Sequence, residues 1–412
     1  MPWVKRKAAD WIGRRQQAIP DRWDESVRRV MDDVRARGDA AVRDWTARFD
    51  GVSVADFRVE GAICRQALDA TDQRLREALV LAAARIRSFL EATRPPGTQS
   101  GPTRDGVEAR VIWEPLRRVA VYVPASQLPL CSSLLMGAIP AQVAGVAEIV
   151  LLTPPQRDGR PDSTMLAASA LLGIDEVYAV GGVQAIAAAA YGTKTLKQVD
   201  AIVGPGNYYV TEAKRQVSGV VRIDGLNGPS EVIVWGAPPA PARQAALDLL
   251  AQAEHDPESW ALALSDRSDW LDDVGRWAEK LGGNLLERAG VGAIAVSTSD
   301  EAVAFVNDFA PEHLELWGPA ALHADRITSA GATFLDCPTP LGDYVAGPNH
   351  VLPTGGQARR ASVLGVEDFL HRRTETRLVG NARRLVAAGA RLAQAEGLLR
   401  HQAALLEFQE RF

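Results

Sequence analysis

The feature that most constrains the fold is an alternation of short β-rich runs and helical segments between residues 117 and 338. The runs are rich in Val, Ile, Leu and Ala, and they span residues 117–124, 148–155, 176–182, 199–206, 230–236, 260–266, 292–298 and 332–338. Apolar helical patterns, such as 163–172 and 240–255, lie between them. This succession predicts βαβ units and mostly parallel sheets. Because so many strands exceed one ordinary sheet, we expect an α/β protein with two lobes.

Both ends of the chain are predicted to be largely helical. Residues 75–96 carry apolar positions at helical spacing and end at a Pro-Pro pair. The tail from 378 to 412 is rich in Ala, Leu and Arg and follows the loop-rich stretch 338–362, so it is a candidate for a separate arm. The sequence shows no internal repeat at a fixed period and no low-complexity tract.

Length and composition exclude several classes of protein. The 412 residues suggest two or three domains, and 47% hydrophobic with 24% charged residues is ordinary for a globular protein. A net charge of −5 leaves no basic surplus, so we expect neither nucleic acid nor an anionic membrane as partner. The apolar stretch 128–152 is interrupted by Pro140, Gln142 and Glu148, which argues against a membrane span.

The cysteines and the N-terminal stretch bear on the compartment. Cys64, Cys131 and Cys337 are widely spaced and form no CxxC pair, so we expect a reducing compartment, hence a cytoplasmic protein, without structural disulfides. The basic stretch at the start lacks an apolar region, so we expect no signal peptide.

Common catalytic and nucleotide-binding fingerprints are missing from the sequence. There is no GxGxxG, GxxxxGK[ST], HExxH or GxSxG. The turns AVGGVQA (179–185) and IVGPGNYYV (202–210) each follow a predicted strand and open a helix. This arrangement suits a phosphate at a helix N-terminus, but such turns also simply reverse the chain. On these turns alone, both interpretations stay open.

Gln252 and His255 stand at the end of an apolar helical pattern, in LDLLAQAEHDPES (247–259). Residues three apart lie on one helix face, so these two side chains can point at a single object. The alternative is a helix end with solvated polar groups. The pair alone does not decide between them.

Four of the six histidines lie in polar or acidic surroundings. They are His255 in QAEHD, His313 directly after Glu312, His350 seven residues after Asp343, and His401 five residues after Glu396. His323 and His371 have no comparable neighbours, and we interpret them as surface or core residues. A zinc site uses imidazole nitrogen and carboxylate oxygen, and the mixed set Gln252, His255, Asp343 and His401 would supply both.

Along nearly its whole length the chain resembles the histidinol dehydrogenase family. The resemblance rests on motifs such as YVPASQLPL, GPGNYYVTEAK, DLLAQAEHDP, FAPEHLEL and GDYVAGPNHVLPTGG. The matching stretches follow the family's order and span residues 34–51, 122–130, 181–193, 204–214, 228–232, 248–257, 309–316, 342–356 and 395–402. Their joint order is far more specific than any single motif.

The resemblance implies an activity and a set of site residues. The family oxidises an amino alcohol, L-histidinol, to the amino acid L-histidine through an aldehyde, with two NAD and one zinc per chain. The matching zinc ligands are Gln252, His255, Asp343 and His401, which also surround the substrate. Glu312 and His313 match the catalytic pair, His313 as the acid–base group and Glu312 as the residue that activates water. Further substrate positions are Ser230, His350 and Glu396, and the cofactor positions are Tyr122, Gln184 and Asn207.

The resemblance also implies an architecture. We expect two α/β lobes with incomplete Rossmann-like parallel sheets, small helical elements at both ends, and an intertwined homodimer with shared active sites. The expected segments are a helical segment at 1–19, a first lobe with the zinc and catalytic residues at 20–121 and 230–363, an NAD-binding lobe at 122–229, and a helical arm at 364–412.

Several of these residues have plainer interpretations when taken singly. Glu312 is compatible with an acid at a helix start, Asp343 and Tyr344 with a turn, and Ser230 with a helix N-cap. The intact order and spacing of the motifs favour the functional interpretations jointly.

The chain departs from the family pattern after Tyr122-Val123-Pro124. Ala125, Ser126 and Gln127 stand where the family usually has Gly-Gly-Lys, so the loop beside the cofactor is expected to follow another path. A related enzyme that oxidises another small alcohol, such as a sulfonated diol, is therefore the first alternative function. A zinc hydrolase without nucleotide is the second, supported only by the missing nucleotide fingerprint.

Overall fold

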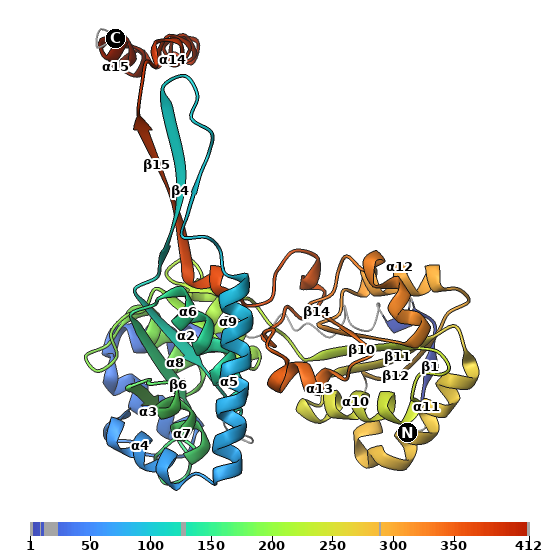
Figure 1. The fold of residues 1–412 in the computed structure, drawn as a ribbon. Helices are drawn as coiled ribbons and strands as arrows, with labels where there is room; N and C mark the ends of the chain where they lie inside the picture. The colour runs from blue at the N-terminus through green and yellow to red at the C-terminus, as the bar shows by residue number, and fades with distance from the viewer. Residues whose placement is uncertain (1–2, 9, 12–23, 125–128, 288–289, 410–412) are drawn as a thin grey trace. The chain divides into compact units, whose positions relative to one another are not determined.

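A computed structural model of the protein describes residues 3–8, 10–11, 24–124, 129–287 and 290–409 (Figure 1). The chain divides into two compact units. The larger consists of residues 1–93 and 116–369, and the smaller of residues 94–115 and 370–412. The larger unit contains two six-stranded sheets, which define lobe A and lobe B. The Ala125–Gln127 departure lies outside the described residues.

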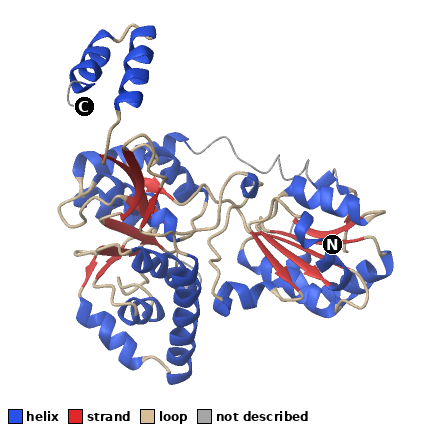
Figure 2. Cartoon of the chain, turned by 45° about the horizontal axis from the view of Figure 1, so that its top comes forward, coloured by secondary structure: helices blue, strands red, loops and turns tan. Residues whose placement is uncertain are grey.

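Lobe A is a parallel sheet with helices on both faces, as Figures 1 and 2 show. Its strand order is β1-β12-β11-β10-β13-β14. The strands are β1 (Lys5–Arg6), β10 (Glu231–Gly236), β11 (Trp260–Ser265), β12 (Gly290–Ala295), β13 (His313–Trp317) and β14 (Ala332–Leu335). Helices α10 (Ala242–His255) and α11 (Ser268–Gly282) pack on one face, and α12 (Ser299–Phe309) packs on the other. Alternating strand residues face the two cores, as expected for a sheet buried on both sides.

Lobe B has the strand order β2-β7-β6-β5-β8-β9. Its strands are β2 (Arg58–Val59), β5 (Arg118–Tyr122), β6 (Glu148–Thr153), β7 (Glu176–Ala179), β8 (Ala201–Val203) and β9 (Arg222–Ile223). Only the short edge strand β2 is antiparallel. One core joins the sheet to α2 (Asp24–Arg37), α3 (Asp39–Phe49), α8 (Gly182–Tyr191) and α9 (Tyr208–Val217). On the other face, Gly137 of α6 (Cys131–Ala144) lies so close to Val121 that no larger side chain fits without a shift.

The remaining helices of lobe B lie N-terminal to β5 or between β6 and β7. They are α4 (Gly61–Ala70), α5 (Gln73–Thr93) and α7 (Ser163–Leu171), and α7 packs against both α4 and α6. Within the described residues, no helix has both the length and the apolar character needed to cross a bilayer.

The smaller unit is an antiparallel ladder followed by two helices. Strand β4 (Val107–Pro115) pairs with β3 (Thr98–Ser100) on one side and with β15 (Leu370–Leu378) on the other. Helices α14 (Arg383–Ala395) and α15 (Leu399–Gln409) pack against each other. Five leucines of these helices and their connection are more than two-fifths exposed, namely Leu385, Leu392, Leu398, Leu399 and Leu406.

The predicted α/β fold with two mostly parallel sheets is confirmed, and each of the eight β-rich runs contains a strand. The segment boundaries differ from those expected. Of the stretch 20–121 that was expected in lobe A, residues 24–93 and 116–121 lie with lobe B, because β5 lies at the centre of that sheet and Ala120 shares a core with Val30, and residues 94–115 belong to the smaller unit. The tail is not wholly helical, since Leu370–Leu378 forms β15 and pairs with β4. Its sequence LHRRTETRL is too polar to stand out as a strand.

Candidate active site

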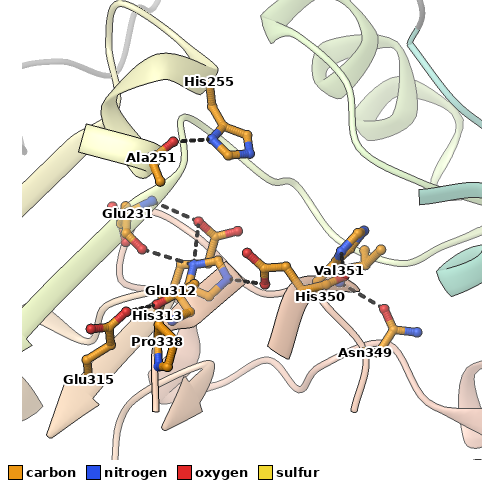
Figure 3. A network of polar contacts seen from close by, with 12 residues as sticks. Glu231, Ala251, His255, Glu312, His313, Glu315, Pro338, Asn349, His350 and Val351 are labelled. Carbon is orange, nitrogen blue, oxygen red and sulfur yellow. Dashed lines mark hydrogen bonds and ion pairs between the residues drawn. The ribbon is translucent and has the colours of Figure 1, made fainter. Parts of the chain in front are cut away.

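The pair Glu312 and His313 lies at the amino end of β13, with both side chains buried (Figure 3). The neighbouring strand holds both residues through Glu231, the first residue of β10. The Glu231 N–H donates to Glu312 Oε2 at 2.8 Å, and His313 Nδ1 lies 3.2 Å from the Glu231 carbonyl oxygen. These contacts follow from the parallel register, which places His313 opposite Val232. A main-chain donor and acceptor thus fix a carboxylate and an imidazole side by side.

His313 also contacts Asp343, which lies in the π-helical turn η3 (Gly342–Ala346) after β14. Its Nε2 is 3.1 Å from Asp343 Oδ1, and its Nδ1 is 3.5 Å from Glu312 Oε2. Burial by itself lowers the pKa of His313, but the Asp343 and Glu312 carboxylates outweigh it and raise the pKa well above the usual value. Burial raises the pKa of Asp343, yet the charge of His313 brings it below the usual value. The two side chains form a buried ion pair.

His350 is placed by the same turn. Its Nδ1 lies 2.7 Å from the Asp343 carbonyl oxygen, and its Nε2 lies 3.3 Å from Ser133 Oγ on α6. The carbonyl requires a proton on Nδ1, so Nε2 accepts from the serine hydroxyl. Burial lowers the pKa of His350, which favours this neutral form. His350 therefore offers a neutral imidazole beside the charged His313–Asp343 pair.

Gln252 and His255 occupy the last turn of α10, as the spacing predicted. Gln252 is buried, whereas His255 is exposed at the helix end. His255 Nδ1 lies 2.9 Å from the Ala251 carbonyl oxygen, so the proton resides on Nδ1 and Nε2 keeps its lone pair. A backbone carbonyl on one ring nitrogen is the usual arrangement of a histidine that binds metal through the other.

The expected metal ligands divide between the two units. Gln252, His255 and Asp343 belong to the larger unit, and His401 lies exposed on α15 of the smaller one, as does Glu396 at the end of α14. Across the described ranges, no group of three or more His, Cys, Asp and Glu lies close enough to hold a metal. The donors nevertheless suit zinc, since they comprise an amide oxygen, an ionised carboxylate and an imidazole with a free Nε2.

The three expected cofactor residues lie at the carboxyl ends of the lobe B strands. Tyr122 ends β5, Gln184 lies in the first turn of α8, and Asn207 caps α9 after β8. The chain leaves β5 towards β6 on one side and later returns to β8 on the other, so strand order reverses beside β5. In open α/β sheets, ligands bind at this switch point, outside the carboxyl ends.

Contacts within this region bring two of the turns together. The Tyr122 hydroxyl accepts from Gly182 N–H at 3.1 Å, at the start of α8. Gly204 has a φ of 116° and lies so close to the Tyr122 carbonyl that a side chain there would collide with it. Gln184 is fully buried, and its Oε1 has no partner among the described residues. A buried amide oxygen without a donor is uncommon in proteins, so this position is unusual in the core of lobe B.

The plainer interpretations of single residues have mixed outcomes. Glu312 does not start a helix, because α12 ends at Phe309 and Glu312 precedes a strand. Ser230 is not a helix N-cap, since it lies directly before β10. Asp343 does lie in a turn, but its carboxylate also contacts His313. Asn207 does cap a helix, with Oδ1 accepting from Val210 N–H.

Sequence reasoning missed two features of this site. Strand β13 was not among the predicted strands, although HLELW alternates apolar and polar residues. The part of Glu231 was also missed, because its backbone rather than its side chain holds Glu312 and His313. Because nearly every residue has the same backbone N–H and carbonyl groups, a pattern of side chains does not predict a backbone contact.

Together, the buried acid–imidazole pair and the two mostly parallel sheets define the class of the protein as an α/β enzyme. The comparisons agree with this class. The histidinol dehydrogenase family profile matches residues 13–407. The chain is 43% identical to histidinol dehydrogenase from Ruegeria pomeroyi over 407 residues, covering 95% of this chain and 93% of that protein. It is 44% identical to histidinol dehydrogenase from Xanthomonas euvesicatoria, covering 87% and 86%.

A solved structure gives the same result. The crystal structure of histidinol dehydrogenase from Elizabethkingia anophelis superposes with a TM-score of 0.92 at 31% identity, covering 98% of this chain and 97% of that one. The chain therefore belongs to the histidinol dehydrogenase family and is an oxidoreductase.

Proposed function

We propose that the protein oxidises L-histidinol to L-histidine through histidinal, with NAD as hydride acceptor, as a cytoplasmic enzyme of histidine biosynthesis. The observation that carries this proposal is the buried Glu312–His313 pair, fixed by the Glu231 backbone at the amino end of β13. The oxidation removes four electrons, and each NAD accepts two, so two NAD are consumed per histidinol.

His313 moves protons in both oxidation steps. In the first step the alcohol carbon gives a hydride to NAD, and His313 accepts the hydroxyl proton after losing the proton that it holds in the ion pair with Asp343. In the second step the aldehyde must first add water. Glu312 lies beside His313 and takes one proton from that water, while His313 gives the proton gained in the first step to the aldehyde oxygen, so that a hydrate forms. The hydrate then gives a hydride to the second NAD and its proton to His313.

We further propose one zinc per chain, held by Gln252, His255, Asp343 and His401. Support comes from the free Nε2 of His255 and from the lowered pKa of Asp343, which keeps its carboxylate ionised. Burial raises that pKa, but the charge of His313 lowers it further. Bound there, zinc would orient the imidazole and amine of the substrate. Ser230 and His350 belong to the proposed substrate site, where His350 Nε2 is engaged only by the Ser133 hydroxyl within the described residues. Tyr122, Gln184 and Asn207 are the proposed NAD contacts.

His401 and Glu396 are proposed to act in the site of a second copy of the chain. Both are exposed on the smaller unit, whose helices also expose several leucines. Exposed apolar surface of this kind is typical of a protein–protein interface. The proposed assembly is a twofold homodimer, in which each site combines the larger unit of one chain with the smaller unit of the other.

Subunit mixing tests the shared site. His255→Ala and His401→Ala are each expected to be inactive, and the two proteins are unfolded, mixed equally and refolded. About half of the dimers are then mixed, and each mixed dimer has one site with both defects and one with none, so roughly a quarter of wild-type activity returns. Activity at the single-mutant background, in a sample shown to contain mixed dimers, contradicts the shared site.

The function itself is tested by incubating the protein with zinc, NAD and L-histidinol and following NADH absorbance. The proposal expects NADH with histidinol and none after chelation of the metal. Parallel reactions contain a sulfonated diol or omit NAD. NADH only with another alcohol assigns a different substrate, and turnover of substrate without NAD excludes a dehydrogenase.

A further inference from the structure

A pair of buried carboxyl groups lies in lobe A, apart from the groups assigned above. Asp248 projects from α10 and is 3% exposed, and Glu315 projects from β13 and is fully buried. Among the described residues, neither forms an ion pair with a Lys or an Arg. Two acids without a cation are costly to bury unless hydrogen bonds compensate them.

Glu315 is supplied with donors from two elements. Its Oε1 accepts from the backbone N–H of Thr339 at 2.7 Å and from the hydroxyl of the same residue. Its Oε2 accepts from Trp317 Nε1 at 2.7 Å. Thr339 begins the short helix α13 (Thr339–Leu341), so the Glu315 carboxylate joins β13 to α13.

Asp248 has a different balance of partners. Its Oδ1 accepts from Gln244 Nε2 at 2.8 Å, but its buried Oδ2 has no donor among the described residues. Burial first, and then the charge of Glu315, raise the pKa of Asp248 to about 8. Within the described residues, Cys337 also faces the pair, and its pKa is raised by burial and by the two acids. At neutral pH, Asp248 therefore keeps a proton, and its hydroxyl is a potential donor from α10 beside the Glu315 carboxylate.

Each of the three joined elements also carries residues of the proposed site. Asp248 lies four and seven residues before Gln252 and His255, a spacing that keeps all three on one helix face. Glu315 lies two residues after His313, on the same side of the strand. Thr339 lies four residues before Asp343.

We propose that Asp248 and Glu315 are a positioning pair, in which neutral Asp248 donates to Glu315 and thereby fixes α10 against β13 and α13. The pair sets the separation between the proposed ligands Gln252 and His255 on one side and Asp343 on the other. This role rests on the proposed function, because it concerns the proposed zinc ligands. Neither residue takes part in the chemistry.

The test measures zinc affinity of the full chain by competition with a chromogenic chelator, together with NADH formation from histidinol. Asp248→Asn keeps a donor towards Glu315, so zinc affinity at pH 7 stays close to that of wild type. Asp248→Leu removes the donor, and we expect zinc affinity to fall about 10- to 100-fold, the range typical of residues that support metal ligands. NAD affinity stays unchanged in both variants, because the NAD contacts lie in lobe B.

A pH series separates this role from general stability. Wild-type Asp248 ionises as the pH rises through about 8, and two adjacent carboxylates then push α10 away from β13. Asparagine does not titrate, so the ratio of Asp248→Asn to wild-type zinc affinity rises between pH 7 and pH 9. Asp368→Asn removes a half-buried acid that also has a raised pKa and lies outside lobe A, and it serves as the matched control with a flat ratio.

The outcomes distinguish the two proposals. A wild-type protein that neither binds zinc nor oxidises histidinol overturns the proposed function. A wild type that does both, beside an Asp248→Leu variant of equal zinc affinity, overturns the positioning pair. If Asp248→Leu does not fold, the pH series decides, and an Asp248→Asn ratio as flat as that of Asp368→Asn contradicts the proposal.

Discussion

The two sheets of the larger unit have the same strand order, but their functional residues are expected at opposite edges. These are the amino edge in lobe A and the carboxyl edge in lobe B. In lobe A the chain passes from β10 through β11 and β12 and then returns to β13 and β14 on the other side. In lobe B it passes from β5 through β6 and β7 and returns to β8 and β9 in the same way. The Glu312–His313 pair lies at the amino ends of the lobe A strands. The expected NAD contacts lie at the carboxyl ends of the lobe B strands.

This difference shows what topology does and does not determine. In open α/β sheets, ligands bind at the carboxyl edge where strand order reverses, and in lobe B Tyr122 and the Gly204 turn lie at that edge. In lobe A the acid–base groups lie at the other edge, where Glu231 offers an N–H and a carbonyl to the neighbouring strand. The same fold thus supports two kinds of site through the side chains at each edge.

The largest expected effect comes from removing the acid–base group of lobe A. His313→Ala should lower the rates of both half-reactions about 10²- to 10⁴-fold, because both release a proton. The half-reactions are measured separately, with histidinol and with histidinal as substrates. His323→Ala is the matched control, since His323 stacks on Trp235 in the same lobe without contacting the site. Retention of either half-reaction at the wild-type rate by His313→Ala would show that the proton moves elsewhere.

A second substitution separates the two members of the pair. Glu312→Gln can still accept from the Glu231 N–H, so the local structure is retained. We expect oxidation of histidinal to fall about 10²-fold or more, because it alone requires activated water, while oxidation of histidinol changes less than tenfold. Equal loss in both half-reactions would refute the division of roles between Glu312 and His313.

The smallest effect is expected at the carboxyl edge of lobe B. Tyr122→Phe removes the hydroxyl that accepts from Gly182 N–H, and this should raise KM for NAD about tenfold by loosening the α8 turn. Zinc affinity should not change, since the zinc ligands belong to other elements. Tyr178→Phe removes a buried hydroxyl from the neighbouring part of the same sheet and is the matched control. Equal changes of KM in the two variants would remove Tyr122 from the NAD site.

The sequence predicted the parts of this comparison that depend on local patterns. Apolar runs gave the parallel strands, and the spacing of Gln252 and His255 correctly placed both on the last turn of α10. Strand β13 was not predicted, because a short alternating run is ambiguous between strand and loop. Strand β15 was not predicted, because most of its residues are charged or polar. The assignment of residues 20–121 to lobe A differs from the structure because the sheet in which a strand lies depends on contacts distant in sequence.

The polar contacts within the site were even less accessible to pattern reasoning. The resemblance named Glu312, His313 and Asp343, but their mutual distances depend on register between β10 and β13 and on the turn after β14. Asp248 and Glu315 look like ordinary acids in the sequence, and only the fold reveals that both are buried and that Glu315 acts on the pKa of Asp248. A single sequence does not predict which side chains on different strands and helices come into contact.

The central claim is that Glu312 and His313, at the amino ends of the lobe A strands, act in two successive oxidations, with NAD bound by lobe B. The most direct measurement is the NADH formed per L-histidinol consumed, with limiting histidinol, excess NAD and zinc, and L-histidine quantified at the end. The account predicts two NADH and one histidine per histidinol. A single NADH with accumulation of aldehyde by the wild-type protein, or NADH formation without histidine, would contradict it.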